Sequence, residues 1–332
     1  MRAALFYEHG GPEVVRVEDV LRPEPRAGEV LIRVRAASMN HLDLWARRGL
    51  PFAIPLPHIG GSDVVGTVEG TRQRVVVNPS LWCGRCRYCV RAEEPLCVEY
   101  RILGEHIDGG FAEFVAVPAA HAYPLPDTLS WEEAAGLPVS YGTAWRAVVT
   151  QAAVRPGEDV LVLGASGGTA IAAIQIAKLA GARVFAVTRG AENVERVRRL
   201  GADVVYDRAE VDWSSQVFRD TGKQGTDVVI ENVGEATWKG SMRALGRGGR
   251  LVTYGATTGP TAEIDLRMLF WKQVRIIGTT MATRADWEAM MRVALRGELR
   301  PVVDSVMPLE QARSAHERLE AGGQFGKIVL LP

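Results

Sequence analysis

The stretch that decides the fold is Asp159–Ala170, which reads D-V-L-V-L-G-A-S-G-G-T-A. Its first five residues form the largely apolar run of a strand that is buried on both faces. A turn of small residues follows, and a helical run through Lys178 begins directly after the turn. Small residues let the backbone approach a pyrophosphate, and the N-terminus of the helix offers it free N–H groups. The stretch therefore predicts the first strand–turn–helix unit of a dinucleotide-binding sheet.

Buried strands and helices alternate downstream of this stretch, which predicts a parallel sheet covered by helices on both faces. The predicted strands there are Arg183–Thr188, Asp203–Tyr206, Asp227–Glu231, Arg250–Tyr254 and Gln273–Thr279. Upstream, short alternating segments separated by Gly and Pro predict a compact β-rich domain. Its clearest predicted strands are Arg2–Tyr7, Glu29–Ala37, Val64–Val68 and Arg74–Val77. The expected fold class is α/β, with a β-rich domain beside a doubly wound parallel sheet.

The four cysteines of the chain all lie between residues 83 and 97. The spacing of Cys83, Cys86, Cys89 and Cys97 lets four sulfurs converge on one tetrahedral ion, and a closed set of thiolates suits a structural zinc. Disulfides are the alternative, but nothing near the N-terminus is typical of a signal peptide. The cluster therefore predicts one structural zinc and a reducing, cytoplasmic location.

The charge balance narrows the range of partners. Lys plus Arg and Asp plus Glu each number 39, so the chain has no net charge. It has no basic field to attract nucleic acid and no polybasic run for a membrane surface. Its apolar stretches are broken well short of a membrane span. We therefore expect a small-molecule substrate, and neither nucleic acid nor a membrane as a partner.

The end of the second strand of the parallel sheet bears on the choice of cofactor. An Asp or Glu at that point would hold the ribose 2′-hydroxyl of NAD(H). This chain has Thr188 and Arg189 instead, and Arg208 follows the third strand. An arginine can pair with the 2′-phosphate of NADP(H). The sequence therefore predicts NADP(H), with NAD(H) as the alternative if Arg189 is only a solvated loop cation.

Taken together, the chain resembles the medium-chain dehydrogenase/reductase family over essentially its full length. The segments that carry the resemblance, besides the cysteine lobe, are Gly10–Val14, Ala36–Asp43, Pro57–Val68, Ser140–Trp145, Gly164–Ala170, Ile230–Gly234 and Phe325–Leu330. The resemblance implies a GroES-like catalytic domain formed by residues 1–139 and 282–332. It also implies a Rossmann dinucleotide-binding domain formed by residues 140–281.

Zinc alcohol dehydrogenases of this family hold a catalytic zinc with Cys, His and Cys. The corresponding positions in this chain are Asn40, Ser62 and, approximately, Val139. An amide, a hydroxyl and an isopropyl group do not make a usable zinc site. The chain is therefore similar to the zinc-independent quinone oxidoreductase and enone reductase branch. It departs from the simplest members of that branch, which lack a cysteine lobe.

Reduction without a metal needs an acceptor that is already activated. A quinone or an α,β-unsaturated carbonyl spreads the charge of an incoming hydride over its own π-system, so the protein mainly aligns the reactants and donates a hydrogen bond to the oxyanion. Asn40 and Ser62 are the predicted donors, and Asp43 is predicted to orient them or to relay a proton with His41. In the alternative interpretation, Asn40 caps the helical run His41–Arg48 with Asp43, and Ser62 is a small filler.

The resemblance also implies which residues contact the cofactor. The predicted set is Thr143, Ser166, Gly167, Gly168, Thr169, Ala170, Thr188, Arg189, Arg208, Asn232, Val233, Gly255, Ala256, Thr257, Thr280 and Met281. Each is alternatively an ordinary loop residue, but ligands of such sheets do bind at the carboxyl ends of the strands. The aromatic residues Tyr141, Trp145, Phe270 and Trp271 are predicted either to line an apolar pocket or to belong to the core or an interface.

Three functional hypotheses remain open. The leading one is an NADPH-dependent reductase of quinones or α,β-unsaturated carbonyls. The second is an alcohol dehydrogenase or aldehyde-ketone reductase whose metal is held by other side chains, such as Asp63 with His58 or His41. The third is a non-catalytic NADPH-binding structural or regulatory protein. In each case the run Val274–Thr279 ends the sheet and predicts pairing with its twin in a homodimer, with a homotetramer possible.

Overall fold

The computed structural model describes the whole chain, Met1–Pro332. The chain forms two compact units. Unit 1 comprises Met1–Val139 and Thr283–Pro332, and unit 2 comprises Ser140–Ala282. The predicted fold class is confirmed, since unit 1 is rich in antiparallel strands and unit 2 carries a parallel sheet with helices.

Unit 1 is built on a seven-stranded sheet in the order β10-β6-β5-β3-β18-β17, with β9 also paired to β3. A three-stranded sheet, β2-β1-β4, and a two-stranded one, β7-β8, complete it. The strands are β1 Arg2–Phe6, β2 Arg16–Asp19, β3 Glu29–Ser38, β4 His58–Ile59, β5 Asp63–Val68, β6 Arg74–Val77, β7 Ser80–Leu81, β8 Arg101–Ile102, β9 Phe114–Pro118, β10 Ala122–Pro124, β17 Val303–Pro308 and β18 Lys327–Leu331. Its helices are α1 His41–Arg48, α2 Trp131–Ala135, α9 Arg284–Ala294 and α10 Ala312–Ala321, while α3 Pro138–Trp145 begins here and continues into unit 2.

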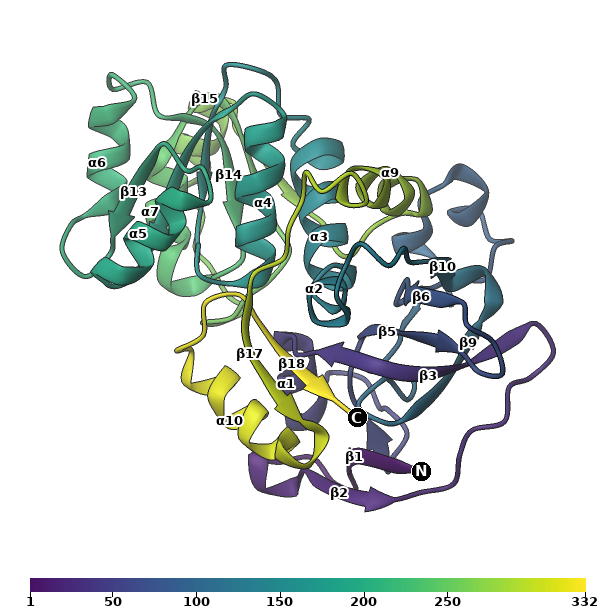
Figure 1. The fold of residues 1–332 in the computed structure, drawn as a ribbon. Helices are drawn as coiled ribbons and strands as arrows, with labels where there is room; N and C mark the ends of the chain where they lie inside the picture. Colours follow the sequence, from purple (N-terminus) through teal and green to yellow (C-terminus); the bar gives the residue numbers. More distant parts are fainter. The chain divides into compact units, whose positions relative to one another are not determined.

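The central strand β3 shows why the alternating sequence forms this sheet. Ile32 and Val34 are buried, and Arg33 and Arg35 are exposed, so one face of the strand joins the core. Near its end, β3 pairs antiparallel with β18, so the first and last parts of the chain lie side by side (Figure 1). The closing strand therefore brings a residue from the C-terminal part of the chain to the end of β3.

Three backbone segments meet at the start of β5. A Cβ added at Gly109 would lie 2.3 Å from the carbonyl oxygen of Gly61 and 2.6 Å from the Cα of Gly104. No side chain fits between these segments, so only glycine allows the approach. The contact fixes the segment that carries Ser62 and Asp63.

Unit 2 contains a six-stranded, entirely parallel sheet in the order β13-β12-β11-β14-β15-β16. The strands are β11 Asp159–Val162, β12 Arg183–Thr188, β13 Val204–Asp207, β14 Thr226–Glu231, β15 Leu245–Thr253 and β16 Arg275–Gly278. The helices are α4 Gly168–Leu179, α5 Ala191–Arg199, α6 Trp213–Asp220, α7 Glu235–Ala244 and α8 Leu266–Lys272. The strand order reverses between β11 and β14, which makes the carboxyl ends of these two strands the expected ligand position.

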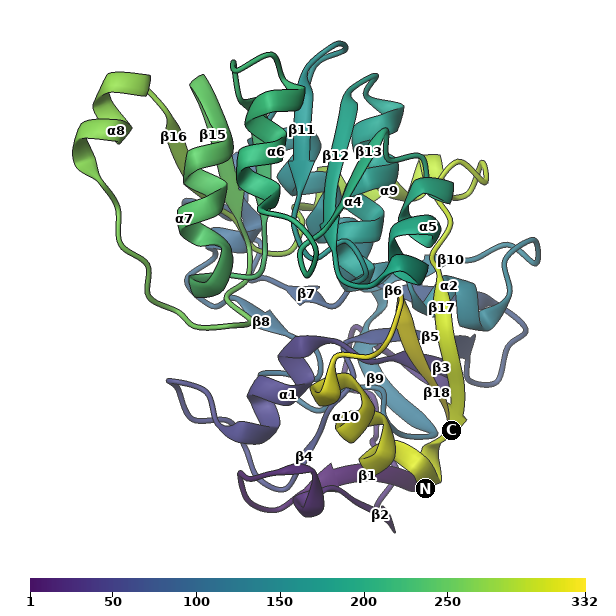
Figure 2. The ribbon, with the colours of Figure 1, turned by 90° about the vertical axis from the view of Figure 1, so that its left-hand side faces the viewer.

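Among the elements that the sequence did not predict are α2, α3, α6, α8, β9 and β17. Helix α8 packs Met268 and Leu269 against the core of unit 2 and leaves Phe270 and Trp271 66% and 69% exposed. These two aromatic residues are therefore not part of the core, whereas Tyr141 is buried. Figure 2 shows α8 at the β16 end of the sheet, where β16 has a strand neighbour on one side only. The pairing of this edge with a second copy stays a prediction.

None of the helices combines the length and the apolar character that crossing a membrane requires.

Candidate active site and metal centre

The turn between β11 and α4 has the features of a phosphate-binding loop. Gly164 adopts φ +63°, and a Cβ there would lie 3.0 Å from Oδ1 of Asn232, so glycine is required on both counts. Helix α4 begins at Gly168, and its N-cap Gly167 provides no side-chain hydrogen bond. The N–H groups of its first turn, which include those of Thr169 and Ala170, remain available to an anion beside Ser166.

Three buried polar atoms at the ends of strands in unit 2 have no hydrogen-bond partner. They are Oγ1 of Thr188, at the end of β12, Oδ1 of Asn232, directly after β14, and the hydroxyl of Tyr254, directly after β15. Buried polar atoms without partners are rare in folded proteins and indicate a missing ligand or water. Their positions at the carboxyl ends of the strands fit a bound dinucleotide.

The other predicted cofactor residues of unit 2 form two contacting groups. In one, the hydroxyl of Thr257 donates to the carbonyl oxygen of Asn232 (3.1 Å), and a Cβ at Gly255 would lie 3.1 Å from that same oxygen. In the other, the hydroxyl of Thr143 lies 4.0 Å from the sulfur of Met281. Val233 donates its N–H to the buried carboxylate of Glu231 (2.8 Å). The side chains of Ala256 and Thr280 do not take part in either group.

Two exposed arginines that make no ion pair follow neighbouring strands: Arg189 comes directly after β12, and Arg208 comes directly after β13. The nearest acid on the adjacent strand is Asp207. Its two carboxylate oxygens already accept the backbone N–H groups of Gly190 and Ala209, each at 2.9 Å. Asp207 is therefore poorly placed to serve as the acid that binds a ribose hydroxyl, and the free charge at this point is positive.

The cysteine lobe of unit 1 has the geometry of a metal centre. The four Sγ atoms lie within 4.8 Å of one another and form no disulfide. The sulfurs of Cys83 and Cys89 are 3.9 Å apart, and those of Cys86 and Cys89 are 3.5 Å apart. A tetrahedral zinc with Zn–S bonds of about 2.3 Å separates its sulfurs by about 3.8 Å. The N–H of Glu99 also donates to Sγ of Cys97 (3.3 Å), as expected for a thiolate.

The predicted catalytic residue Asn40 belongs to a buried polar network in unit 1. Its Nδ2 donates to Oδ2 of Asp63 (2.8 Å), and its Oδ1 accepts a hydrogen bond from Nζ of Lys327 (2.6 Å). The same ammonium lies 3.0 Å from Oδ2 of Asp63. A cation, an amide and a carboxylate thus meet at the position that corresponds to the family's catalytic metal.

Asp63 is the centre of this network and is fully buried. Its Oδ2 also accepts from the hydroxyl of Ser38 (2.7 Å), and its Oδ1 accepts the N–H of Val139 (2.7 Å). The carboxylate therefore brings together Asn40 and Val139, which the family resemblance aligns, for Val139 approximately, with two ligands of the zinc enzymes.

Asp43 holds the backbone of this region in place. Its Oδ2 accepts the N–H of Asn40 (2.7 Å), and its Oδ1 accepts the N–H of Gly61 (3.0 Å). The capping interpretation is confirmed, since Asn40 is the N-cap of α1 and Asp43 completes a capping box with it. Burial raises the pKa of Asp43 to about 7, against the opposing effect of the two N–H donors and Lys327.

Ser62 and His41 are not joined to the Asn40 network by a side-chain contact. Ser62 is fully buried, and its hydroxyl donates to the carbonyl oxygen of Leu103 (2.5 Å). His41 packs its ring near that of Trp45, and burial lowers the pKa of its imidazole. Asn40 is therefore the better placed of the two predicted donors.

Lys327 is a site residue that the sequence did not predict, and Asp63 was expected only in the alternative metal site. In the sequence, Lys327 stands within the family's closing segment, Phe325–Leu330. A signal was present, because a lone lysine opens an otherwise apolar strand, Lys327–Leu331. Its partner Asn40 lies 287 positions away, so no local pattern could have identified the pair.

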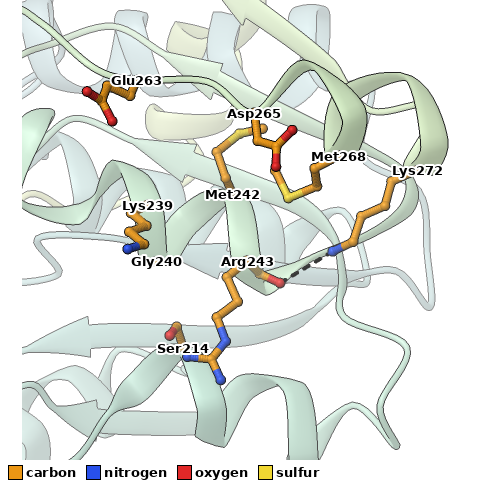
Figure 3. A pocket seen from close by; sticks show the side chains of 9 residues that line it. All are labelled: Ser214, Lys239, Gly240, Met242, Arg243, Glu263, Asp265, Met268 and Lys272. Carbon is orange, nitrogen blue, oxygen red and sulfur yellow. Dashed lines mark hydrogen bonds between the residues drawn. The ribbon is translucent and has the colours of Figure 1, made fainter.

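A separate cavity of about 480 Å³ lies among α6, α7 and α8 of unit 2. Met242 and Met268 contribute to its wall, and Figure 3 shows Lys272 reaching toward the backbone oxygen of Arg243. Two of its cations already have partners, because Lys272 donates to the carbonyl oxygen of Leu245 (2.6 Å) and Arg243 lies 3.4 Å from Asp212. None of the predicted cofactor residues lines this cavity.

The raised pKa of Asp43 predicts a pH-dependent stability. An unfolded aspartate titrates near pH ~4, so between about pH 4 and pH 7 the folded chain holds one proton more than the unfolded chain. The contribution of Asp43 to the free energy of unfolding therefore falls as the pH rises through this window, by up to about 1.4 kcal/mol per pH unit. Denaturant titrations at pH 5, 6, 7 and 8 should show this slope reduced in Asp43→Asn. The exposed control Asp127→Asn should keep it, and an unchanged slope in Asp43→Asn would refute the assignment.

Comparisons with known proteins find matches for both parts of the chain. Residues 26–127 match the family model described as alcohol dehydrogenase GroES-like domain, and residues 168–296 match the model described as zinc-binding dehydrogenase. The chain is 33% identical over 342 residues to quinone oxidoreductase of Mus musculus, covering 100% of this chain and 98% of the relative. It is 34% identical over 342 residues to acryloyl-coenzyme A reductase of Metallosphaera sedula, covering 99% of each.

Solved structures give the same result. The chain superposes on a crystal structure of an NAD-dependent alcohol dehydrogenase with a TM-score of 0.96 and 43% identity, and all of both chains is covered. The relatives thus include reductases and alcohol dehydrogenases that share both domains of this chain. By its full-length similarity and its two matched domains, the chain belongs to the medium-chain dehydrogenase/reductase family and is an NAD(P)-dependent oxidoreductase.

Proposed function

We propose that this oxidoreductase uses NADPH to reduce quinones or α,β-unsaturated carbonyl compounds, and that it does so without a catalytic zinc. The observation that carries the proposal is the Lys327–Asn40–Asp63 network at the position of the family's catalytic metal. The names of two relatives, a quinone oxidoreductase and an acryloyl-coenzyme A reductase, fit an acceptor of this kind.

The network leaves little capacity for a metal ion. Zinc needs ligand atoms with free lone pairs, preferably sulfur or imidazole nitrogen. Both oxygens of Asp63 already accept hydrogen bonds, and Oδ1 of Asn40 accepts one from Lys327. A divalent cation would in addition be repelled by the ammonium that already neutralises Asp63. A positive charge is thus present at this position, and a side chain supplies it.

Asn40 can support hydride transfer as a hydrogen-bond donor. When bound, the nicotinamide supplies a hydride to the β-carbon of an enone or to a carbonyl oxygen of a quinone, and negative charge develops on the acceptor's remaining carbonyl oxygen. The amide N–H of Asn40 donates to this oxyanion and stabilises it. A proton then adds to the reduced acceptor and completes the hydroquinone or the saturated carbonyl. Asp43 keeps Asn40 in place by binding its backbone N–H.

Positive charge near the nucleotide loop supports NADPH as the cofactor. Arg189 and Arg208 make no ion pair, and Asp207 has both oxygens occupied by backbone N–H groups. A 2′-phosphate would therefore meet two free arginines and no free acid. A ribose 2′-hydroxyl would lack the carboxylate that NAD sites commonly offer.

A metal-dependent alcohol dehydrogenase reaction is less well supported, although relatives carry that name. It would require Asp63 to bind a metal with His58 or His41. Asp63 has four hydrogen-bonding partners, and Nε2 of His58 lies 3.1 Å from the carbonyl oxygen of Gly104. A non-catalytic NADPH-binding protein would bind the cofactor and turn over none of the acceptors tested below.

The direct test measures oxidation of NADPH and NADH with a panel of quinones, enones, aldehydes and ketones. We expect NADPH-dependent turnover of quinones or enones, and no oxidation of simple alcohols. Asn40→Leu should lower kcat on the order of 10²-fold, because it removes the oxyanion donor. Ser62→Ala should have a smaller effect, since its proton is bound to Leu103. Preferred turnover of simple alcohols, or full activity of Asn40→Leu, would contradict the proposal.

The cofactor preference is tested by Arg189→Ala. Removing one charged partner of a phosphate should raise the KM for NADPH about 10-fold or more and leave the KM for NADH unchanged. Arg199→Ala is the matched control, because Arg199 is exposed on α5 and already pairs with Glu195. Equal effects of Arg189→Ala on both cofactors would mean that Arg189 does not bind a 2′-phosphate.

We also propose that the cysteine lobe holds one structural zinc. Cys86→Ser should lose the zinc and lower the thermal stability, since serine is a poor zinc ligand. Molecules that remain folded should keep their kcat. Val90→Ser, an exposed change in the same lobe, should retain the metal. Zinc analysis with thermal melts checks this, and full zinc content in Cys86→Ser would count against a four-thiolate site.

A further inference from the structure

The side chain of Lys327 is a buried cation that no part of the reaction described above yet uses. It opens β18 and is 4% exposed. A buried ammonium is costly unless its charge and its N–H groups find partners. Lys327 has two such partners, Oδ1 of Asn40 at 2.6 Å and Oδ2 of Asp63 at 3.0 Å.

These two partners fix the orientation of the Asn40 amide. An ammonium can only donate and a carboxylate can only accept, so Oδ1 must face Lys327 and Nδ2 must face Asp63. Both contacts favour the same amide orientation. In the flipped amide, Nδ2 would face the ammonium of Lys327, and Oδ1 would face the carboxylate of Asp63. One Nδ2 hydrogen is thereby assigned to Asp63.

The second Nδ2 hydrogen of Asn40 is the least committed donor of the network. Its only recorded partner is the carbonyl oxygen of Ser38, at 3.5 Å, which is at the limit of a hydrogen bond. Asn40 also retains slight exposure, at 8%, whereas Asp63 has none. An ammonium bonded to the amide oxygen polarises the amide and strengthens its remaining N–H as a donor.

We propose that Lys327 is a positioning residue for the reaction: it locks and polarises the amide of Asn40 so that this amide presents a hydrogen-bond donor to the oxyanion of the acceptor. This inference rests on the proposed function. It adds that Lys327 contributes positive charge to the stabilisation of the oxyanion and does so through the amide of Asn40. Asp63 then serves as the counter-charge that allows the ammonium to be buried.

The test compares Lys327→Met and Lys327→Arg with the wild-type chain. Lys327→Met should lower kcat for the preferred quinone or enone by about 10-fold or more and leave the Kd for NADPH within about twofold. Lys327→Arg should restore part of kcat, because it returns a buried cation. In the Asn40→Leu background, Lys327→Met should cost no more than about a further twofold, since the residue acts through Asn40.

Two further variants keep the test decisive. If Lys327→Met does not fold because Asp63 is left unpaired, the double variant Lys327→Met/Asp63→Asn removes both charges and takes its place. Arg47→Met is the matched control, because Arg47 is a fully buried cation of unit 1 that pairs with Glu320 at 2.7 Å. It should leave kcat of the folded protein unchanged.

A measurement that does not involve turnover separates this inference from the proposed function. The chain has four asparagines, so the side-chain amide signal of Asn40 can be resolved by NMR after ¹⁵N-asparagine labelling and assigned by its loss in Asn40→Leu. Lys327→Met should shift or broaden this signal. If the wild-type chain reduces no acceptor, the proposed function fails and the NMR result alone decides the role of Lys327. An unchanged Asn40 signal, additive losses in the double variant, or a loss confined to NADPH affinity would each overturn the inference.

Discussion

The candidate active site depends on one buried carboxylate, that of Asp63. It accepts hydrogen bonds from Ser38, Asn40 and the backbone of Val139, and it pairs with Lys327. These partners come from β3, from the residue before α1, from α3 and from β18, which are far apart in the chain. A buried ion pair contributes little net stability, but removing one member leaves an unpaired charge that is strongly destabilising. Asp63 and Lys327 therefore depend on each other, and together they determine where the amide of Asn40 lies.

The kind of acceptor that the site can reduce depends on whether a zinc ion or the ammonium of Lys327 carries the positive charge. A zinc ion is a Lewis acid that binds and activates an alcohol or a plain carbonyl directly. An ammonium that acts through an amide supplies a weaker and strictly hydrogen-bonding field. Such a field is sufficient only when the acceptor itself spreads the charge, as quinones and α,β-unsaturated carbonyls do. The same fold can thus serve either chemistry, and under the proposed function the side chains at the positions of Asn40, Ser62 and Val139 decide between them.

Much of the fold could be predicted from the sequence because its determinants are local. The apolar run and small-residue turn of Asp159–Ala170 became β11 and the start of α4, and the alternation in Glu29–Ala37 became β3. Helix α8 escaped prediction because it is only 7 residues long and carries apolar residues on both its packed side, Met268 and Leu269, and its exposed side, Phe270 and Trp271. At the site, Asn40 and Asp43 could be named from the family motif. Two other contacts could not be predicted, because they join residues that are far apart in the sequence. They are the hydrogen bond from Ser62 to the carbonyl oxygen of Leu103 and the hydrogen bond from Lys327 to Asn40.

The central claim is that a protein cation, and not a metal ion, serves the Asn40 position. The most direct test is anomalous X-ray scattering on crystals of the unmodified protein grown with zinc. The data are measured above and below the zinc absorption edge. The account predicts one anomalous peak per chain, surrounded by Cys83, Cys86, Cys89 and Cys97, with Nζ of Lys327 bonded to Asn40. A second peak within bonding distance of Asn40 or Asp63, with Lys327 displaced, would contradict it.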